Sequence, residues 1–102
     1  MMLSEIQVTS DPGQIFSLVV DGQKVSLRLR YNTHSERFSM DLSIDETPRL
    51  TGRKVVTNVD LLKPFDFGIG SIFAAAPDGS PVKPTIDAFA ARQVRLYHYA
   101  AP

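Results

Sequence analysis

Hydrophobic and polar residues alternate strictly along two neighbouring runs of the chain, 24–31 and 37–44. Because the side chains of a strand point to opposite faces in turn, this period of two predicts two strands with one apolar and one polar face each. The predicted apolar faces hold Val25, Leu27, Leu29 and Tyr31 in the first run and Phe38, Met40, Leu42 and Ile44 in the second. The predicted polar faces hold Ser26, Arg28 and Arg30, followed by Arg37, Ser39, Asp41 and Ser43.

A third strand is predicted immediately before these two. Residues 15–20 are rich in β-branched and aromatic side chains, and the dipeptide Asp21 and Gly22 that follows favours the positive φ angles of a tight hairpin turn. The polar segment 32–36 predicts a second turn, in which Asn32 suits a left-handed or Asx geometry. Together the three strands predict an antiparallel meander with one buried face.

The pattern after the meander is weaker. Residues 45–48 predict a turn, and residues 49–59 predict a strand in which Gly52 marks a bulge or bend. Further along, we expect an irregular segment at 61–70, strands at 71–75 and 93–99, a proline-rich loop at 77–84 and a single helical turn at 85–91. Six to seven short strands predict an all-β fold, either a small antiparallel barrel or a sandwich.

Length and composition agree with one globular unit. A chain of 102 residues that is 43% hydrophobic is expected to form a single β-rich domain over residues 1–102, with residues 1–13 as an N-terminal arm. The first residues lack the basic and apolar regions of a signal peptide, and the apolar runs are too short to cross a membrane. We therefore expect the protein to be made and folded in the cytoplasm.

Charge and cysteine content narrow the function classes. Eleven basic and eleven acidic residues give a formal net charge of zero, which argues against a dedicated nucleic-acid binder. The chain has no cysteine, so disulfides, thiol chemistry and thiolate zinc sites are excluded.

No set of residues predicts a catalytic site. Of the two histidines, His34 lies in the polar turn as a solvated side chain, and His98 is expected to be a packed or hydrogen-bonded strand residue. A triad drawn from His34, Ser39 and Asp41 lacks a strained nucleophile turn, because Ser39 and Asp41 point outward from an ordinary strand. An enzyme is therefore the weakest of the functional hypotheses, and we expect no catalytic residue.

Cofactor and metal sites are not predicted either. Gly68 and Gly70 lack the third glycine, the Lys-Ser/Thr pair and the helix of a phosphate-binding loop. The acidic residues do not show the spacing of a calcium loop.

The three arginines on the polar faces, Arg28, Arg30 and Arg37, allow two interpretations. With Tyr31 and Phe38 nearby, they could belong to a small OB-like nucleic-acid-binding module. Alternation, however, places these aromatic residues on the face opposite to the arginines, whereas a platform for stacking bases needs both on one side. A solvated or partner-facing strand surface is therefore favoured, and the OB-like module is the alternative.

The segment "DGQKVSLRLRYNTHSERFSMDL", with "LTGRKVVTNVDLL" and the terminal "VRLYHY" after it, resembles the small baseplate plug proteins of contractile-tailed (myovirus-like) bacteriophages. The resemblance covers residues 12–99 and rests on the order and spacing of four short signatures. Their matching positions are Leu27, Arg28, Leu29, Arg30 and Asn32; Arg37, Phe38, Asp41 and Leu42; Gly52, Asp60, Leu61 and Leu62; and Leu96, Tyr97 and Tyr99. Phe38 stands where that family frequently has tryptophan, and residues 64–85 match less well, so we expect a variable loop region there.

The resemblance implies a structural virion protein of the contractile-tail baseplate, a plug that contacts the central hub and the tube-end proteins. It implies no catalysis, cofactor or metal. It also implies that several copies enter a symmetric assembly, which is built in the host cytoplasm. The implied partners are hub, tail-tube end and wedge proteins, with no membrane and no nucleic acid. The interface candidates are Arg28, Arg30, Arg37, Leu61, Leu62, Phe65 and Phe67.

Overall fold

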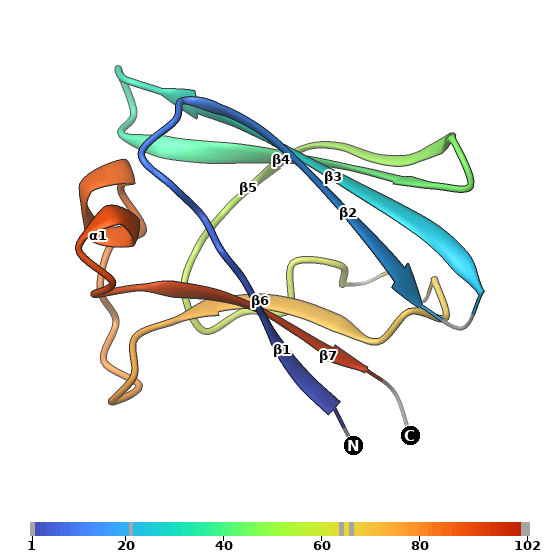
Figure 1. The fold of residues 1–102 in the computed structure, drawn as a ribbon. Helices are drawn as coiled ribbons and strands as arrows, with labels where there is room; N and C mark the ends of the chain where they lie inside the picture. The colour runs from blue at the N-terminus through green and yellow to red at the C-terminus, as the bar shows by residue number, and fades with distance from the viewer. Residues whose placement is uncertain (1, 21, 64, 66, 101–102) are drawn as a thin grey trace.

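Two antiparallel sheets face each other in the computed structural model, which describes residues 2–20, 22–63, 65 and 67–100. The first sheet has the order β2-β3-β4-β5, with β2 at Gly13–Val20, β3 at Gln23–Asn32, β4 at Arg37–Ile44 and β5 at Thr47–Lys54. The second has the order β1-β7-β6, with β1 at Met2–Ile6, β7 at Arg95–Ala100 and β6 at Ser71–Ala75. Figure 1 shows them as two separate layers with a short helix at one end, so the fold is a sandwich and not a closed barrel.

The predicted meander is confirmed as β2, β3 and β4. The β2–β3 hairpin pairs Val20 with Gln23, and Gly22 has φ +77°, as the tight turn requires; Asp21 lies outside the described residues. In the second turn the side-chain oxygen of Asn32 accepts hydrogen bonds from the N–H groups of His34 and Ser35, which is the predicted Asx geometry.

The turn after β4 is tighter than the sequence predicted. Asp45 and Glu46, with φ of 49° and 69°, form the whole connection, because Ile44 already pairs with Thr47. Two register shifts between β4 and β5 insert extra residues into β5, and Gly52 occupies one of them with φ +71°. The bulge predicted at Gly52 is therefore confirmed.

The strand predicted over 49–59 begins and ends earlier, because the chain leaves the first sheet after Lys54. Val55 turns into the core and is 1% exposed. The following residues run beside β6, where the Asn58 N–H donates to Ala74 O at 2.8 Å and the Leu61 N–H donates to Ile72 O at 2.7 Å. This segment connects the two sheets.

The second sheet joins residues from both ends of the chain. β1 lies within the N-terminal segment that was expected to be an arm, and it pairs with β7 from Met2↔Ala100 to Ile6↔Leu96. β6, a strand predicted at 71–75, lies within the segment 64–85 and pairs with β7 on its other side. The predicted helical turn is α1 (Ile86–Ala90), which begins after Thr85, whose side chain accepts a hydrogen bond from the Ala88 N–H.

The hydrophobic core fills the space between the sheets. Phe38 of β4 is completely buried, and its ring lies 4.9 Å from that of Tyr31 and 5.7 Å from that of Phe89 in α1. All four predicted inward residues of β4 are buried, as are Val25, Leu27 and Leu29 of β3, whereas Tyr31 is only half-buried. The polar side chains of the meander are thereby held on the outer face of the first sheet.

Candidate interaction surface

The outer face of the four-stranded sheet carries a mixture of cationic, small polar and aliphatic side chains. The register places Ile15, Arg28 and Asp41 in one row across β2, β3 and β4. Arg28 and Arg30 are exposed, and Arg37 is half-buried, so the predicted outward orientation of the arginines is confirmed. Two residues that the sequence analysis did not single out, Ile15 and Val19 on β2, are 72% and 78% exposed on this face.

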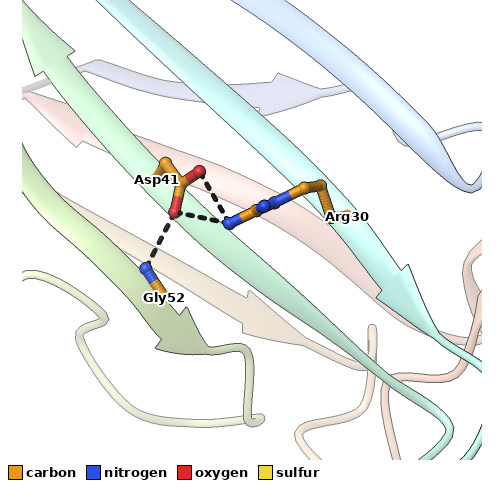
Figure 2. A network of polar contacts seen from close by, with 3 residues as sticks. All are labelled: Arg30, Asp41 and Gly52. Atoms are coloured by element: carbon orange, nitrogen blue, oxygen red, sulfur yellow. Dashed lines mark hydrogen bonds and ion pairs between the residues drawn. The ribbon is translucent and has the colours of Figure 1, made fainter.

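Asp41 links three strands of this face. Its Oδ2 lies 3.1 Å from Nη2 of Arg30 on β3, and its Oδ1 accepts the Gly52 N–H of β5 at 2.8 Å (Figure 2). The bulge makes the second contact possible, because the left-handed backbone at Gly52 turns its N–H toward the carboxylate. Arg30 is therefore engaged within the sheet, with half of its side chain still exposed.

The guanidinium groups of Arg28 and Arg37 have no hydrogen bond or ion pair with the residues that the structure describes. Arg28 borders a hollow of about 300 Å³ whose wall is partly aliphatic, with Ile15, Pro48 and Leu50. An unpaired guanidinium next to apolar surface offers a partner protein both a charge and a packing surface.

The second group of interface candidates divides between core and surface. Leu61 and Leu62 are each 1% exposed and belong to the core, so they offer no contact surface in this fold. They face inward because the segment after β5 lies against β6, a long-range arrangement that local pattern does not reveal. Phe65 is 53% exposed and its ring stacks on that of the half-buried Phe67 at 5.7 Å.

A second surface, on the outer face of the three-stranded sheet, escaped the sequence analysis. Leu3 is 57% exposed and pairs with Tyr99, and the rings of Phe73 and Tyr97 lie 5.5 Å apart. The alternation in the terminal segment "VRLYHY" was the available signal, since burial of Leu96 and His98 turns the two tyrosines outward. At the edge of this face Glu5 lies 2.9 Å from Arg92 and raises the pKa of that arginine.

The side chains considered as catalytic candidates either take part in structural hydrogen bonds and ion pairs or lie exposed in a turn. His98 is buried, and its Nε2 lies 2.6 Å from the carbonyl oxygen of Ile69, so Nε2 carries the proton and donates. His34 is exposed in its turn, while Asp41 is occupied by Arg30 and Gly52, so the two do not form a triad with Ser39. Gly68 and Gly70 have φ of 76° and 89° in a loop that no helix follows directly.

Metal-binding clusters and membrane-spanning helices were considered for the part of the chain that the structure describes. No group of three or more histidine or acidic side chains is arranged there to hold a metal ion. None of its helices has the length and apolar character needed to span a membrane.

Comparison with known proteins supplies the family. A protein-family model described as "Cyanophage baseplate Pam3 plug gp18" matches residues 3–101, and the search of curated proteins found no match. The matched range runs from Leu3 of β1 to the end of β7 and includes both outer faces. The resemblance to baseplate plug proteins is thereby confirmed.

Proposed function

The chain belongs to the family of cyanophage baseplate plug proteins, and from that membership we propose that it is a structural subunit that contacts the central hub and the tube-end proteins of the tail. In this proposal several copies enter a symmetric baseplate that assembles in the host cytoplasm. The protein works by fitting its neighbours, and no enzymatic step is assigned to it.

One observation carries the proposed contact surface: Arg28 and Arg37 are unpaired within the described chain and share the outer face of the first sheet with exposed Ile15. Arginine and large apolar side chains are enriched at protein interfaces, and both are present here on a flat sheet. Phe65 adds an exposed aromatic ring in the connection between the sheets. The balanced charge of the whole chain removes general repulsion from neighbouring subunits.

The alternative, an OB-like module for nucleic acid, loses its main support. Phe38 is completely buried and Tyr31 half-buried, both on the inner side of the sheet, so neither can stack a base beside the arginines. Arg30 is moreover neutralised by Asp41. Single-stranded oligonucleotide at low salt, where electrostatic affinity is strongest, is expected not to bind.

The test is co-purification of the full chain with the hub and tube-end proteins that the same phage encodes. We expect the wild-type chain to be retained and the double variant Arg28→Glu with Arg37→Glu to be lost. Lys83→Glu, an exposed charge reversal in the loop before α1, is the control for a charge change outside the first sheet and is expected to be retained.

Two outcomes would overturn the proposal. If mass spectrometry finds that purified tails of the phage do not contain the chain, the proposed virion role is wrong. Retention of the double arginine variant at the wild-type level would remove the proposed contact surface and leave family membership intact.

A further inference from the structure

Three of the four sheet edges in the described structure are shielded against pairing with another strand. β5 carries Pro48, Arg49, Arg53 and Lys54 and is interrupted by the two register shifts. β6 is covered by the segment 57–61, which donates two backbone hydrogen bonds to it. β1 is only five residues long. Prolines, charges, bulges, covering segments and short strands are the usual means of keeping an edge from pairing.

β2 has none of these features. Its eight residues, "GQIFSLVV", contain no charge and no proline, and its register with β3 is unbroken from Gly13 to Val20. Ile15 and Val19 on its outer face are the two most exposed large hydrophobic residues of the described chain, at 72% and 78%. Because the other three edges are shielded and β2 is long, regular and apolar, β2 is the edge best suited to pair with a further strand.

The backbone of β2 is oriented for such pairing. The Tyr31 N–H donates to Pro12 O at 2.8 Å, and these two residues continue the β2–β3 register by one step. Because hydrogen-bonded pairs alternate along an antiparallel ladder, the even-numbered residues of β2 exchange hydrogen bonds with β3. The N–H and C=O groups of Ile15, Ser17 and Val19 therefore point away from β3, toward the open edge.

The pattern of side chains is symmetric about Ser17. Ile15 and Val19 lie two residues to either side of it, and Phe16 and Leu18 lie one residue to either side. In an antiparallel pair of two β2 strands centred on Ser17, Ile15 lies opposite Val19 of the second copy, and Phe16 lies opposite its Leu18. Ile15, Ser17 and Val19, whose N–H and C=O groups point toward the open edge, then all lie at hydrogen-bonded positions, as an antiparallel ladder requires.

We propose that β2 is a homotypic pairing edge, on which the β2 strand of a second copy adds antiparallel around a two-fold axis at Ser17. The two four-stranded sheets then form one continuous eight-stranded sheet across the pair. The two-fold axis brings the side chain of the central residue, Ser17, next to its own equivalent, so a charge at this position would meet a like charge, and β2 carries no charge there or anywhere else along its length. Phe16 and Leu18, which are only half-buried in the single chain, gain apolar contacts in the pair.

The absence of cysteine from the chain allows a direct test of the register. Ser17→Cys places the single thiol on the axis, where Cα atoms of a hydrogen-bonded antiparallel pair lie about 5.5 Å apart, within the range that a disulfide spans. Under a mild oxidant we expect this variant to form a covalent dimer at least about tenfold faster than Ile15→Cys, whose equivalents lie four residues out of register. Combining Ile15→Cys with Val19→Cys is expected to restore crosslinking, because these positions face each other.

Sedimentation of the unmodified chain supplies the second readout. We expect a reversible dimer, and Ser17→Lys is expected to weaken it by about tenfold or more, because the two ammonium groups meet on the axis. Thr51→Lys, an exposed substitution on the shielded edge β5, is expected to leave it unchanged.

Three results would overturn the pairing. The first is a wild-type chain that stays monomeric up to millimolar concentration. The second is Ser17→Cys that crosslinks no faster than Ile15→Cys. The third is a Ser17 amide that becomes protected from hydrogen exchange only when a hub protein is added, since another protein would then occupy the edge.

Discussion

Asp41 lies directly opposite Arg28 in the β3–β4 register, but its carboxylate forms its ion pair with Arg30, in the neighbouring row of the same face. The other side of the carboxylate is held by the Gly52 N–H, which the bulge of β5 brings within 2.8 Å. Asp41 thereby connects β3, β4 and β5, and Arg28 keeps a charge that no described residue neutralises. The network engages one arginine within the sheet and leaves the guanidinium of the other without an ion pair among the described residues.

Removing the side chain of Asp41 and removing that of Arg30 are expected to lower the free energy of unfolding by different amounts. Asp41→Ala loses both the ion pair and the acceptor of the Gly52 N–H, and is expected to lower the free energy of unfolding by about 1 kcal/mol. Arg30→Ala loses only a half-exposed ion pair and is expected to cost less than about 0.5 kcal/mol. Urea unfolding of the two variants measures the difference, and equal costs would contradict the role given to Gly52.

Gly52 is expected to resist substitution because of its backbone angle and not because of crowding. A methyl group at this position would meet no atom within 4 Å, but φ is +71°. Gly52→Ala is therefore expected to destabilise the protein by about 1–2 kcal/mol. Gly13→Ala has equally open space and no positive φ, so it serves as the control and is expected to be nearly neutral in the same unfolding measurement.

Phe38 is expected to be the most sensitive core position of the meander. It is completely buried between Tyr31 and Phe89, so Phe38→Ala opens a cavity between the first sheet and α1. The expected loss is about 3–5 kcal/mol of unfolding free energy, measured by thermal or urea unfolding. Val59→Ala, at a residue that is 49% exposed, is the control, and a comparable loss there would contradict the assignment of the core.

The loop after β6 has a defined acid response. The Ser80 hydroxyl at 2.7 Å and then the Ser80 N–H at 3.0 Å lower the pKa of Asp78. A carboxyl with a depressed pKa in the folded state adds stability above its unfolded pKa and loses it as the pH falls through the folded pKa. Ser80→Ala is expected to raise the pKa of Asp78, as followed by NMR titration of its carboxyl carbon.

Ser39→Ala, on the distant first sheet, controls for unrelated effects and is expected to leave that titration as it was. An Asp78 that titrates identically in Ser80→Ala and in the unmodified chain would show that another group depresses its pKa.

The parts of the fold that depend on residues close together in the sequence could be predicted from the sequence. The meander was predictable because each of its strands alternates along its own length and each turn is made by residues suited to it. β1 was not, because its strand character depends on pairing with β7, whose residues lie at the other end of the chain. The bulge could be placed at Gly52, but its hydrogen bond to Asp41 depends on the exact register of β4 and β5.

The candidate surface was predictable to the same extent. Alternation placed Arg28 and Arg30 on the outer face, but it could not show which of them Asp41 neutralises. Leu61 and Leu62 looked like exposed apolar anchors because their segment has no regular pattern, and only its position against β6 explains their burial. Ile15 and Val19 could be recognised as outward residues of an edge only when the strand order was known.

The pairing of β1 with β7 has a mechanical consequence. Met2 lies opposite Ala100, so a force applied between the two ends of the chain acts on the hydrogen bonds of this ladder one pair after another. A ladder that is peeled open in this way resists far less than one in which all bonds are sheared together. The domain is therefore weak under tension applied between Met2 and Ala100, because such a force opens the β1–β7 ladder from its end.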